Sequence, residues 1–411
     1  MNVLRRSAAV LAATAVIGAA APAMTALAAD APSPSASAVL PSGLYGSTDP
    51  RYDGVWRQSL ALLAQRTVGV TPAGKAVDWL AGQQCANGSF AAFRAEPTAA
   101  CDAKVTVDTN STAAAVQALK AVGGHDDAVR KAVTWLKARQ NKDGGWGYAA
   151  GMPSDTNSTG VVVGALTAAD ESADRTPYGL LATWSIPCDQ DSGGGLAYQP
   201  GKDGKLSANA DATAAGVLGA LGKGFVTTAG KAPVEGYVCA NSDKALTPAE
   251  VARNGAAYLA DAMSGQGHLV SALAGAKPQP DYGNTADAVV ALAAQGWTAQ
   301  AKKPYAWLEA HATPWAKQSG PAAYAELVFA AHAMGADPRD FGGTNLVTAL
   351  NATGPAPAAA AQHTEEQQGK KSGQKSGQKS GTSVWWIVGT GLVAGVGIGF
   401  LFSGRRKQRQ L

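Results

Sequence analysis

The sequence predicts an all-α fold: an α/α toroid of about five or six helical hairpins, followed by one C-terminal transmembrane helix. Three observations predict it. A helical motif with Trp, Leu and Gln at fixed spacing recurs along the chain. Each copy is followed by a short polar segment and an almost wholly apolar helix. Near the end of the chain, residues 384–402 carry no charge, and a helix of that length nearly spans a bilayer.

The N-terminus predicts an export signal. Arg5 and Arg6 precede an apolar run at 8–21, and Ala-Leu-Ala stands at 26–28. A basic start, a short apolar segment and an A-x-A site are typical of a cleavable signal peptide. We therefore expect residues 1–28 to be a signal peptide and the Pro/Ser-rich residues 29–44 to be a linker.

Residues 45–350 are expected to form the repeat domain. Segment 75–90 aligns without a gap with segment 131–146, and fainter copies lie near 253–269, 184–195 and 307–308. The apolar residues of each copy have helical spacing, and a glycine after the glutamine ends the helix. Both clear copies have the motif's Trp, Leu, Gln and Gly, which in the second copy are Trp135, Leu136, Gln140 and Gly144, and both end on an aromatic residue, here Trp146.

The helix after each copy has a recurring polar start. The sequence Asp-Thr-Asn-Ser-Thr occurs at 108–112 and 155–159, and weaker starts occur at 211–213, 282–287 and 322–326. Such residues accept hydrogen bonds from the unpaired N–H groups of a helix start. The helices that follow are apolar on all sides, which is typical of buried helices. Alternating outer and inner helices form an open solenoid or a closed ring, and wholly apolar inner helices favour the ring.

The segment 131–146 resembles the QW repeat of squalene–hopene and oxidosqualene cyclases. The resemblance extends from about Asp53 to Leu350 and implies the α/α-toroid superfamily of prenyltransferases and terpene cyclases. That superfamily also includes complement-like thioester domains and transcobalamin-like carriers. The resemblance implies a site at the mouth of the ring, where the inner helices begin.

We expect a ligand site at this mouth, because aromatic walls with a few convergent polar groups are typical of small-molecule sites. Capping alone explains Asp, Ser and Thr there, whereas it does not explain why Asn stands third in both copies of Asp-Thr-Asn-Ser-Thr. The candidate ligand residues are Asp108, Asn110, Thr112, Trp146, Tyr148, Asp155, Asn157, Thr159, Tyr198, Asp211, Thr213, Tyr282, Asn284 and Thr285.

Most catalytic signatures of the resembled families are missing from the sequence. The acidic D-x-D-D-T motif of the cyclases has its nearest match at 108–112, with one carboxylate, and a proton donor for an alkene needs neighbouring groups that tune it. There is no G-C-G-E-Q thioester segment, and the five histidines show no metal-ligand spacing. We therefore predict no catalytic residue, no metal ligand and no required cofactor.

The sequence thus favours a non-catalytic protein that captures a small molecule. The resemblance suggests a corrinoid, or an isoprenoid or other lipid-like molecule. Two alternatives stay open: an enzyme of the terpene-cyclase-like or polysaccharide-lyase-like type, and a structural or adhesive domain of the cell envelope. Transcobalamin-like carriers close over their ligand with a β domain, which this chain lacks, so a lid-supplying protein or a transporter is the expected partner.

Charge and cysteines bound the function further. Ten of the 34 basic residues and three of the 30 acidic ones lie outside residues 45–350, so the repeat domain is near neutral, which argues against nucleic-acid binding. An even number of cysteines in an exported protein favours disulfides. Three pairings can be drawn, and we prefer Cys85–Cys101 with Cys188–Cys239 because these staple neighbouring loops.

The C-terminal end predicts a membrane anchor. Residues 351–383 are rich in Lys, Ser, Gly and Gln and are expected to form a disordered stalk. Trp385 and Trp386 stand at the start of the expected transmembrane helix, residues 384–403. The basic tail, 404–411, is expected in the cytoplasm by the positive-inside rule. We therefore expect a single-pass protein of the cell membrane with its large domain outside.

Overall fold

The computed structural model describes residues 40–102, 105–232, 236–242, 244–271 and 277–359. The expected signal peptide, transmembrane helix and cytoplasmic tail lie outside the described residues, as do most of the linker and of the stalk. Within the part of the chain that is described, no helix has both the length and the apolar character needed to cross a bilayer.

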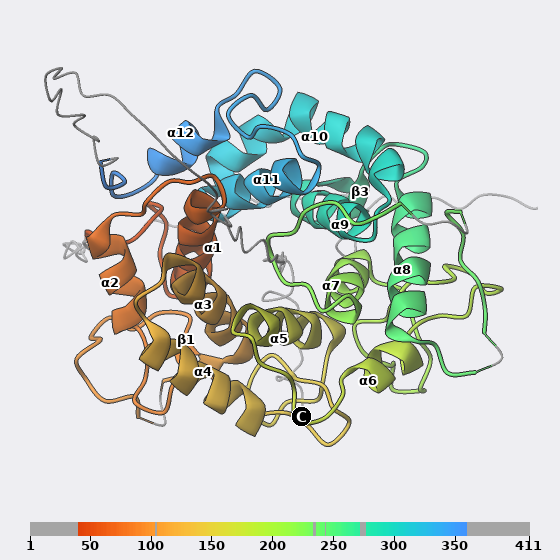
Figure 1. Ribbon diagram of the computed structural model, residues 1–411, viewed down its shortest axis with the longest axis horizontal. Helices are drawn as coiled ribbons and strands as arrows, with labels where there is room; N and C mark the ends of the chain where they lie inside the picture. Colours follow the sequence, from red (N-terminus) through yellow and green to blue (C-terminus); the bar gives the residue numbers. More distant parts are fainter. Residues whose placement is uncertain (1–39, 103–104, 233–235, 243, 272–276, 360–411) are drawn as a thin grey trace, which may run out of the picture. The chain divides into compact units, whose positions relative to one another are not determined.

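Six helices form a closed inner ring. Each packs against the next, and the last packs against the first, which confirms the expected closed toroid (Figure 1). Their sequences are dominated by Ala, Val and Leu, and most of these side chains are fully buried. The inner helices are α1 (Gly54–Thr67), α3 (Thr109–Val122), α5 (Thr156–Ala168), α7 (Ala210–Ala220), α9 (Tyr282–Ala294) and α11 (Pro321–Ala333).

Small residues allow the inner helices to pack closely. At Gly160 of α5, an added Cβ would lie 2.3 Å from the carbonyl oxygen of Ala215 in α7. At Gly219 of α7, an added Cβ would lie 2.9 Å from the Cα of Gly160. The two backbones therefore touch, and a larger residue at Gly160 would force these helices apart.

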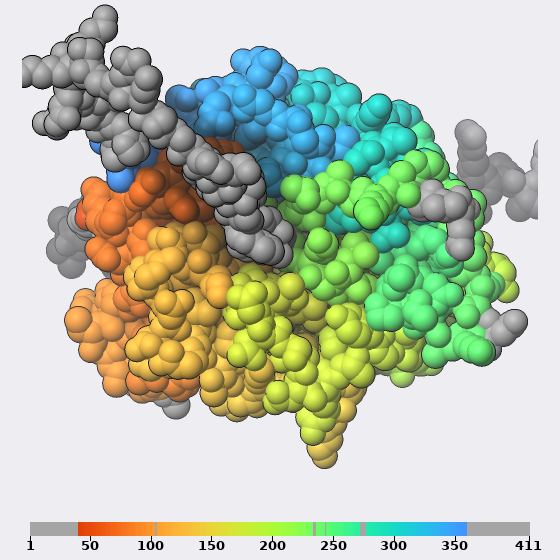
Figure 2. All heavy atoms as spheres, in the orientation of Figure 1, coloured from red at the N-terminus to blue at the C-terminus, as the bar shows by residue number. Residues whose placement is uncertain are grey.

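Six outer helices surround the ring: α2 (Gly74–Gly82), α4 (Asp126–Ala138), α6 (Tyr178–Thr183), α8 (Pro248–Ala262), α10 (Thr298–Ser319) and α12 (Leu346–Asn351). The first five each precede the next inner helix in the chain, as the repeats predict. The sixth comes from the C-terminal end of the domain, where Gln65 of α1 donates to Asn351 at 2.7 Å. In the view of Figure 2, the coloured segments meet one another along the lower part of the rim.

The aromatic residue of the repeat returns onto its own helix, as expected. Trp146 is fully buried, and its indole Nε1 donates to the carbonyl oxygen of Leu136 at 2.7 Å. In two other repeats, the segment after the outer helix forms a short antiparallel pairing that leads into the next inner helix. Strand β1 (Phe90–Ala91) pairs with β2 (Val107–Asp108), and β3 (Leu269–Ser271) pairs with β4 (Gln279–Asp281).

The folded domain extends beyond the expected limits of residues 45–350. On the N-terminal side, Gln58 donates to the carbonyl oxygen of Gly43 at 2.9 Å. On the C-terminal side, the Tyr45 hydroxyl donates to the carbonyl oxygen of Pro355 at 2.8 Å, and the Ala358 N–H donates to Thr71 at 3.0 Å. The first residues of the expected stalk therefore pack on the domain.

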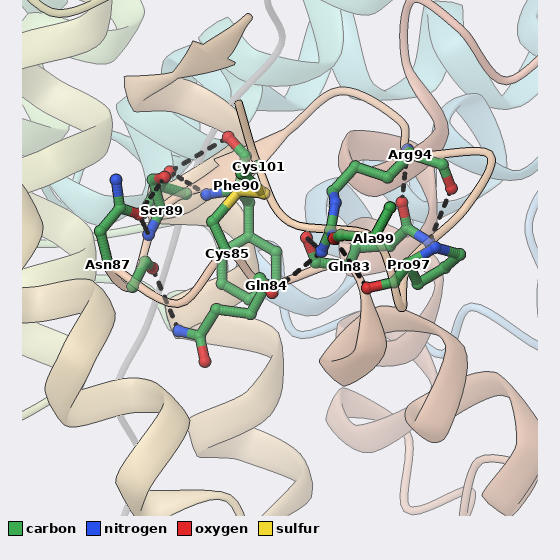
Figure 3. Close-up of a disulfide and its surroundings, with 12 residues drawn as sticks. Gln83, Gln84, Cys85, Asn87, Ser89, Phe90, Arg94, Pro97, Ala99 and Cys101 are labelled. Atoms are coloured by element: carbon green, nitrogen blue, oxygen red, sulfur yellow. Dashed lines mark hydrogen bonds between the residues drawn. A yellow bond between two sulfur atoms is a disulfide. The ribbon is translucent and has the colours of Figure 1, made fainter. Parts of the chain in front are cut away.

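Two disulfides join Cys85 to Cys101 and Cys188 to Cys239, which confirms the preferred pairing. Figure 3 shows the first of them in the loop between α2 and β2. Beside it, the buried Arg94 guanidinium donates to the carbonyl oxygens of Gln84 at 3.0 Å and of Pro97 at 2.7 Å, and also to that of Ala99. The bond and the arginine together fix a loop that has little regular structure.

The loop after α7 crosses the ring, as Figure 1 shows in green. An added Cβ at Gly224 would lie 2.5 Å from the side-chain oxygen of Gln117 in α3. Phe225 is fully buried, with its ring edge-on to Trp56 of α1 at 5.3 Å between centroids. The Gly230 N–H donates to Ala293 of α9 at 2.8 Å. The loop therefore ties together inner helices that lie far apart in the sequence.

Candidate functional site

Four consecutive inner helices start with the same hydrogen bond. In α3, α5, α7 and α9, the side chain of the N-cap residue accepts the N–H of the third helical residue, which is the usual capping geometry. The four caps are Asp108 (2.6 Å), Asp155 (2.7 Å), Asn209 (2.8 Å) and Asp281 (3.2 Å). The sequence predicted the first two. The starts at Asp211 and Tyr282 were placed two residues and one residue too late, although aligning the threonines would have found Asn209 and Asp281.

A threonine at the fourth helical position fastens each loop to its helix. Each hydroxyl accepts a backbone N–H from the second residue after the repeat's glycine, and each threonine is fully buried. The pairs are Thr112 with Phe90 (2.9 Å), Thr159 with Trp146 (3.0 Å), Thr213 with Leu196 (2.9 Å) and Thr285 with Leu269 (3.0 Å). We call these four threonines the loop clamps. They and Trp146, all expected to face a ligand, have structural hydrogen bonds instead.

The second helical position carries the polar groups that capping does not use. It is Asn110 in α3, Asn157 in α5 and Asp211 in α7, with exposures of 4%, 4% and 8%. The amide nitrogen of Asn157 donates to the carboxylate of Asp211 at 2.5 Å. The side-chain oxygens of Asn110 and Asn157 have no hydrogen-bond partner among the described residues. Buried polar atoms are nearly always paired, so two unpaired oxygens at equivalent places need an explanation.

The same position in α9 is Gly283, and a carboxyl group from another helix fills its place. An added Cβ at Gly283 would lie 3.2 Å from the Oε2 atom of Glu326 in α11 and 3.6 Å from the indole of Trp315 in α10. Sequence reasoning missed both residues as site residues. The only available signal was the glycine itself, which stands where the three preceding repeats have a polar side chain. We call Asn110, Asn157, Asp211 and Glu326 the mouth arc.

The carboxyl groups of the mouth arc hold protons unusually tightly. Burial raises the pKa of Asp211 to about 7, against the hydrogen bond from Asn157, and the carboxylates of Asp281 and Asp155 add to the rise. Burial also raises the pKa of Glu326 to about 8, and Asp281 and Asp211 raise it further. The Glu326 residue as a whole keeps some exposure, while its carboxyl group is enclosed. Near neutral pH both carboxyl groups therefore exchange between the protonated and the charged form.

Two candidate tyrosines lie beside the arc. The loop before each inner helix runs over the start of the preceding one, so Thr109 donates to the carbonyl oxygen of Tyr148 at 2.8 Å and Thr156 to that of Tyr198 at 3.0 Å. The Tyr198 phenol is hydrogen-bonded to Asp155. Burial raises the pKa of both phenols, so they stay neutral. Burial also raises the pKa of Asp155 to about 6, against its capping hydrogen bonds.

Tyr282 and Asn284 contact neighbours of the arc. The Tyr282 ring is stacked between Trp307 and Trp315 of α10, at 5.0 and 5.5 Å between centroids. The Asn284 amide donates to the capping carboxylate of Asp281 at 2.8 Å. The structure therefore brings Asn157 and Asp211 into contact and places Asn110 at the equivalent position of α3, whereas Tyr282 and Asn284 support the start of α9.

The chemistry of this site is hydrogen bonding and proton exchange. Among the described residues there is no group of three or more His, Cys, Asp or Glu that could hold a metal ion. The site offers two amide oxygens, two titrating carboxyl groups and an aromatic border from Tyr148, Tyr198 and Trp315.

Residues 108–194 match the family model of the squalene-hopene cyclase C-terminal domain. The match begins at the N-cap of α3 and spans the second clear copy of the repeat. Over these residues, less than a quarter of the chain, the match supports the resemblance to the prenyltransferase and terpene cyclase superfamily. No sequence relative is found among curated proteins.

Several solved structures resemble the domain at low identity. A protein from Actinoplanes has 17% identity and a TM-score of 0.43, over 66% of this chain and 76% of that one. The type II terpene cyclase MstE from Scytonema has 14% identity and a TM-score of 0.42, over 65% and 72%. An ent-copalyl diphosphate synthase from Streptomyces platensis has 15% identity and a TM-score of 0.42, over 69% and 50%. At such TM-scores the assignment of the fold depends on the helix packing described above.

Proposed function

We propose that this chain is a non-catalytic protein that captures a small molecule on the mouth arc. The observation that carries the proposal is the pair of unpaired amide oxygens on Asn110 and Asn157, which are buried at equivalent positions of neighbouring helices. Leaving such an atom without a partner costs about 1–3 kcal/mol. A bound ligand that donates hydrogen bonds to both oxygens would remove this cost.

The arc favours some ligand classes over others. A pure hydrocarbon offers no donor and would leave both amide oxygens unpaired. An anionic ligand such as a diphosphate would meet the carboxyl groups of Asp211 and Glu326, with Asp155 and Asp281 close by. A ligand with N–H or O–H donors fits best. A corrinoid, whose rim carries carboxamide groups, meets this requirement, and an isoprenoid meets it only with a polar head group.

The expected membrane anchor would hold this site at the cell surface. A signal peptide at 1–28 and a transmembrane helix at 384–403 would place the ring outside the membrane on a stalk. A transporter or a lid-supplying protein would then receive the ligand or cover it. These parts of the proposal rest on the sequence patterns alone.

Retention of a coloured ligand tests the proposal. The purified full-length chain is incubated with cobalamin and related corrinoids, desalted, and read by its visible spectrum. We expect retained colour in the wild type and in Gln318→Leu, which alters an exposed residue of α10, and loss of colour in Asn110→Leu. Retention that is equal in all three proteins would rule out the mouth arc as the corrinoid site.

A second candidate function is acid catalysis, and one observation favours it. Asp211 pairs a pKa of about 7 with an enclosed site and a hydrogen bond from Asn157, which suits a general acid. Turnover of squalene or a geranylgeranyl substrate that disappears in Asp211→Asn would support this function. Turnover that survives Asp211→Asn would exclude that residue as the acid.

A further inference from the structure

We propose that the mouth arc recognises its ligand through an organic ammonium group attached to an apolar body. This inference rests on the proposed capture function and names the chemical class of the captured molecule. Its main support is that Asn157, Asp211 and Glu326 bring hydrogen-bond acceptors and negative charges together from three inner helices, with Asn110 at the equivalent position of a fourth. No cation of the described residues is among the charges that act on Asp211 or Glu326.

The acceptors of the arc come from successive inner helices. The amide nitrogen of Asn157 is committed to Asp211, so its oxygen is left to accept from something else. Asn110 presents an equivalent oxygen one helix earlier, and Glu326 places a carboxyl group over Gly283 two helices later. An ammonium group has up to three donors and no acceptor, so it complements such an arrangement.

The charges around the arc are all negative. Asp211 is acted on by Asp155 and Asp281, and Glu326 by Asp281 and Asp211. Asp108 caps α3 at the same end of the ring, and the phenols of Tyr148 and Tyr198 stay neutral. No Lys or Arg of the described chain is among the charges that act on Asp211 or Glu326. Protons now relieve this repulsion, and a ligand cation would replace them.

Helix N-termini ordinarily favour anions, so the arc needs a reason to favour a cation. The reason is that carboxylates already occupy the capping positions of α3, α5 and α9: Asp108, Asp155 and Asp281. Each of these groups accepts an N–H of the first turn. The carboxyl groups of Asp211 and Glu326 do not cap these helices, and a ligand cation would offset their charge.

The surroundings favour an organic cation over a metal ion. The described residues include no cluster of three carboxyl, imidazole or thiol groups at metal-binding distances. Trp315 approaches Gly283 beside Glu326, and Tyr148 and Tyr198 cover the starts of α3 and α5. These rings would contact an apolar body next to the ammonium group.

Isothermal titration calorimetry with matched probes tests the inference. The purified full-length chain is titrated with octylamine and with octanol at pH 7, in phosphate and in HEPES, which differ in ionisation enthalpy. We expect octylamine to bind at least tenfold more tightly and to release protons on binding, so that its heat differs between the buffers. Octanol binding as tightly as the amine, or amine binding without proton release, would overturn the inference.

Variants separate this inference from the capture function. Asp211→Asn and Glu326→Gln should each weaken octylamine binding at least tenfold and lower the proton release, while Asp174→Asn, an exposed control, should not. Asn110→Leu removes an acceptor without touching a carboxyl group and serves where a charge variant fails to fold. If a neutral corrinoid is retained while no amine binds, the capture function stands and the ammonium inference is wrong. If neither binds, both are wrong.

Discussion

The two sides of the inner ring differ at the starts of their helices. In α3, α5 and α7 the second helical residue is polar and the fourth is a clamping threonine, and α9 shares the threonine. In α11 and α1 the second residues are Ala322 and Val55, and no side chain makes a capping hydrogen bond. Both sides are equally part of the closed ring.

This difference shows which polar residues at the helix starts the ring needs in order to pack. Helices α11 and α1 pack into the ring without a buried polar group at the second position, so the toroid does not require Asn110, Asn157 or Asp211. The loop clamps have a structural explanation on the side where they occur, because each holds a loop residue. In the mouth arc, the hydrogen bond between Asn157 and Asp211 links α5 to α7, but the amide oxygens of Asn110 and Asn157 have no such explanation. A ligand is the explanation we propose for them.

The largest expected effect is the dependence of stability on pH that the carboxyl groups of the mouth arc cause. The folded pKa values of Asp211 and Glu326 lie above their ordinary values of 3.8 and 4.5, so the folded chain keeps protons that the unfolded chain has released. Their contribution to stability is therefore complete below about pH 4 and is lost as the pH rises through 7 and 8. For Asp211 alone the loss amounts to about 4 kcal/mol.

Urea unfolding from pH 4 to pH 9 measures this effect. Asp211→Asn should flatten the decline, and the exposed control Asp174→Asn should leave it unchanged. If the stability of the wild type rises over this range, the carboxyl groups of the arc do not keep their protons in the folded chain.

The second expected effect concerns the disulfides, which lie in the outer loops. Closing a loop of 51 residues, as Cys188–Cys239 does, stabilises a chain by roughly 4 kcal/mol, and the 16-residue separation of Cys85 and Cys101 by roughly 3 kcal/mol. Replacing each pair by serine should lower the melting temperature in that order. Binding at the arc should persist in either variant that stays folded, because neither bond touches it.

The third effect distinguishes a loop clamp from the mouth arc. Thr159→Val keeps the shape of the side chain but leaves the buried N–H of Trp146 without its acceptor, so we expect a loss of about 2 kcal/mol in the free energy of unfolding. Ligand affinity should change little. Thr134→Val on the exposed face of α4 is the matched control, since its hydroxyl bonds only within its own helix. Equal losses in the two variants would show that the loop clamps do not stabilise the fold through these hydrogen bonds.

The smallest expected effect has the opposite sign. Asn110→Leu removes an unpaired buried oxygen, so the free energy of unfolding should increase by about 1 kcal/mol while ligand binding is lost. Residues kept for binding commonly reduce stability in this way. A clear destabilisation by Asn110→Leu would indicate a structural role for this residue.

Local patterns in the sequence predicted much of the fold. The capping residues Asp108 and Asp155, the outer helices and the return of Trp146 all follow from residues close together in the chain. The disulfide pairing followed from the proximity of loops. The start of α7 was misplaced because Asp211 was aligned with the caps, although Thr213 keeps the register of Thr112 and Thr159.

The rest of the site depends on contacts between distant residues. Glu326 and Trp315 reach Gly283 because α9, α10 and α11 pack against one another, and no local pattern marks either of them. The raised pKa values also depend on packing between helices, since burial and the meeting of Asp155, Asp211, Asp281 and Glu326 cause them. The extension of the domain to Ala358 depends on contacts with Thr71 and with the segment around Tyr45.

The most direct test is the melting temperature of the full-length chain across a panel of corrinoids and alkylamines. A ligand that binds only the folded chain stabilises it by about 2.7 kcal/mol at one hundred times its dissociation constant, which corresponds to a rise of at least about 5 °C. We predict such a rise for at least one compound in the wild type and its loss in the double variant Asn110→Leu with Asp211→Asn. An equal rise in both proteins, or no rise with any compound, would contradict a binding site on the mouth arc.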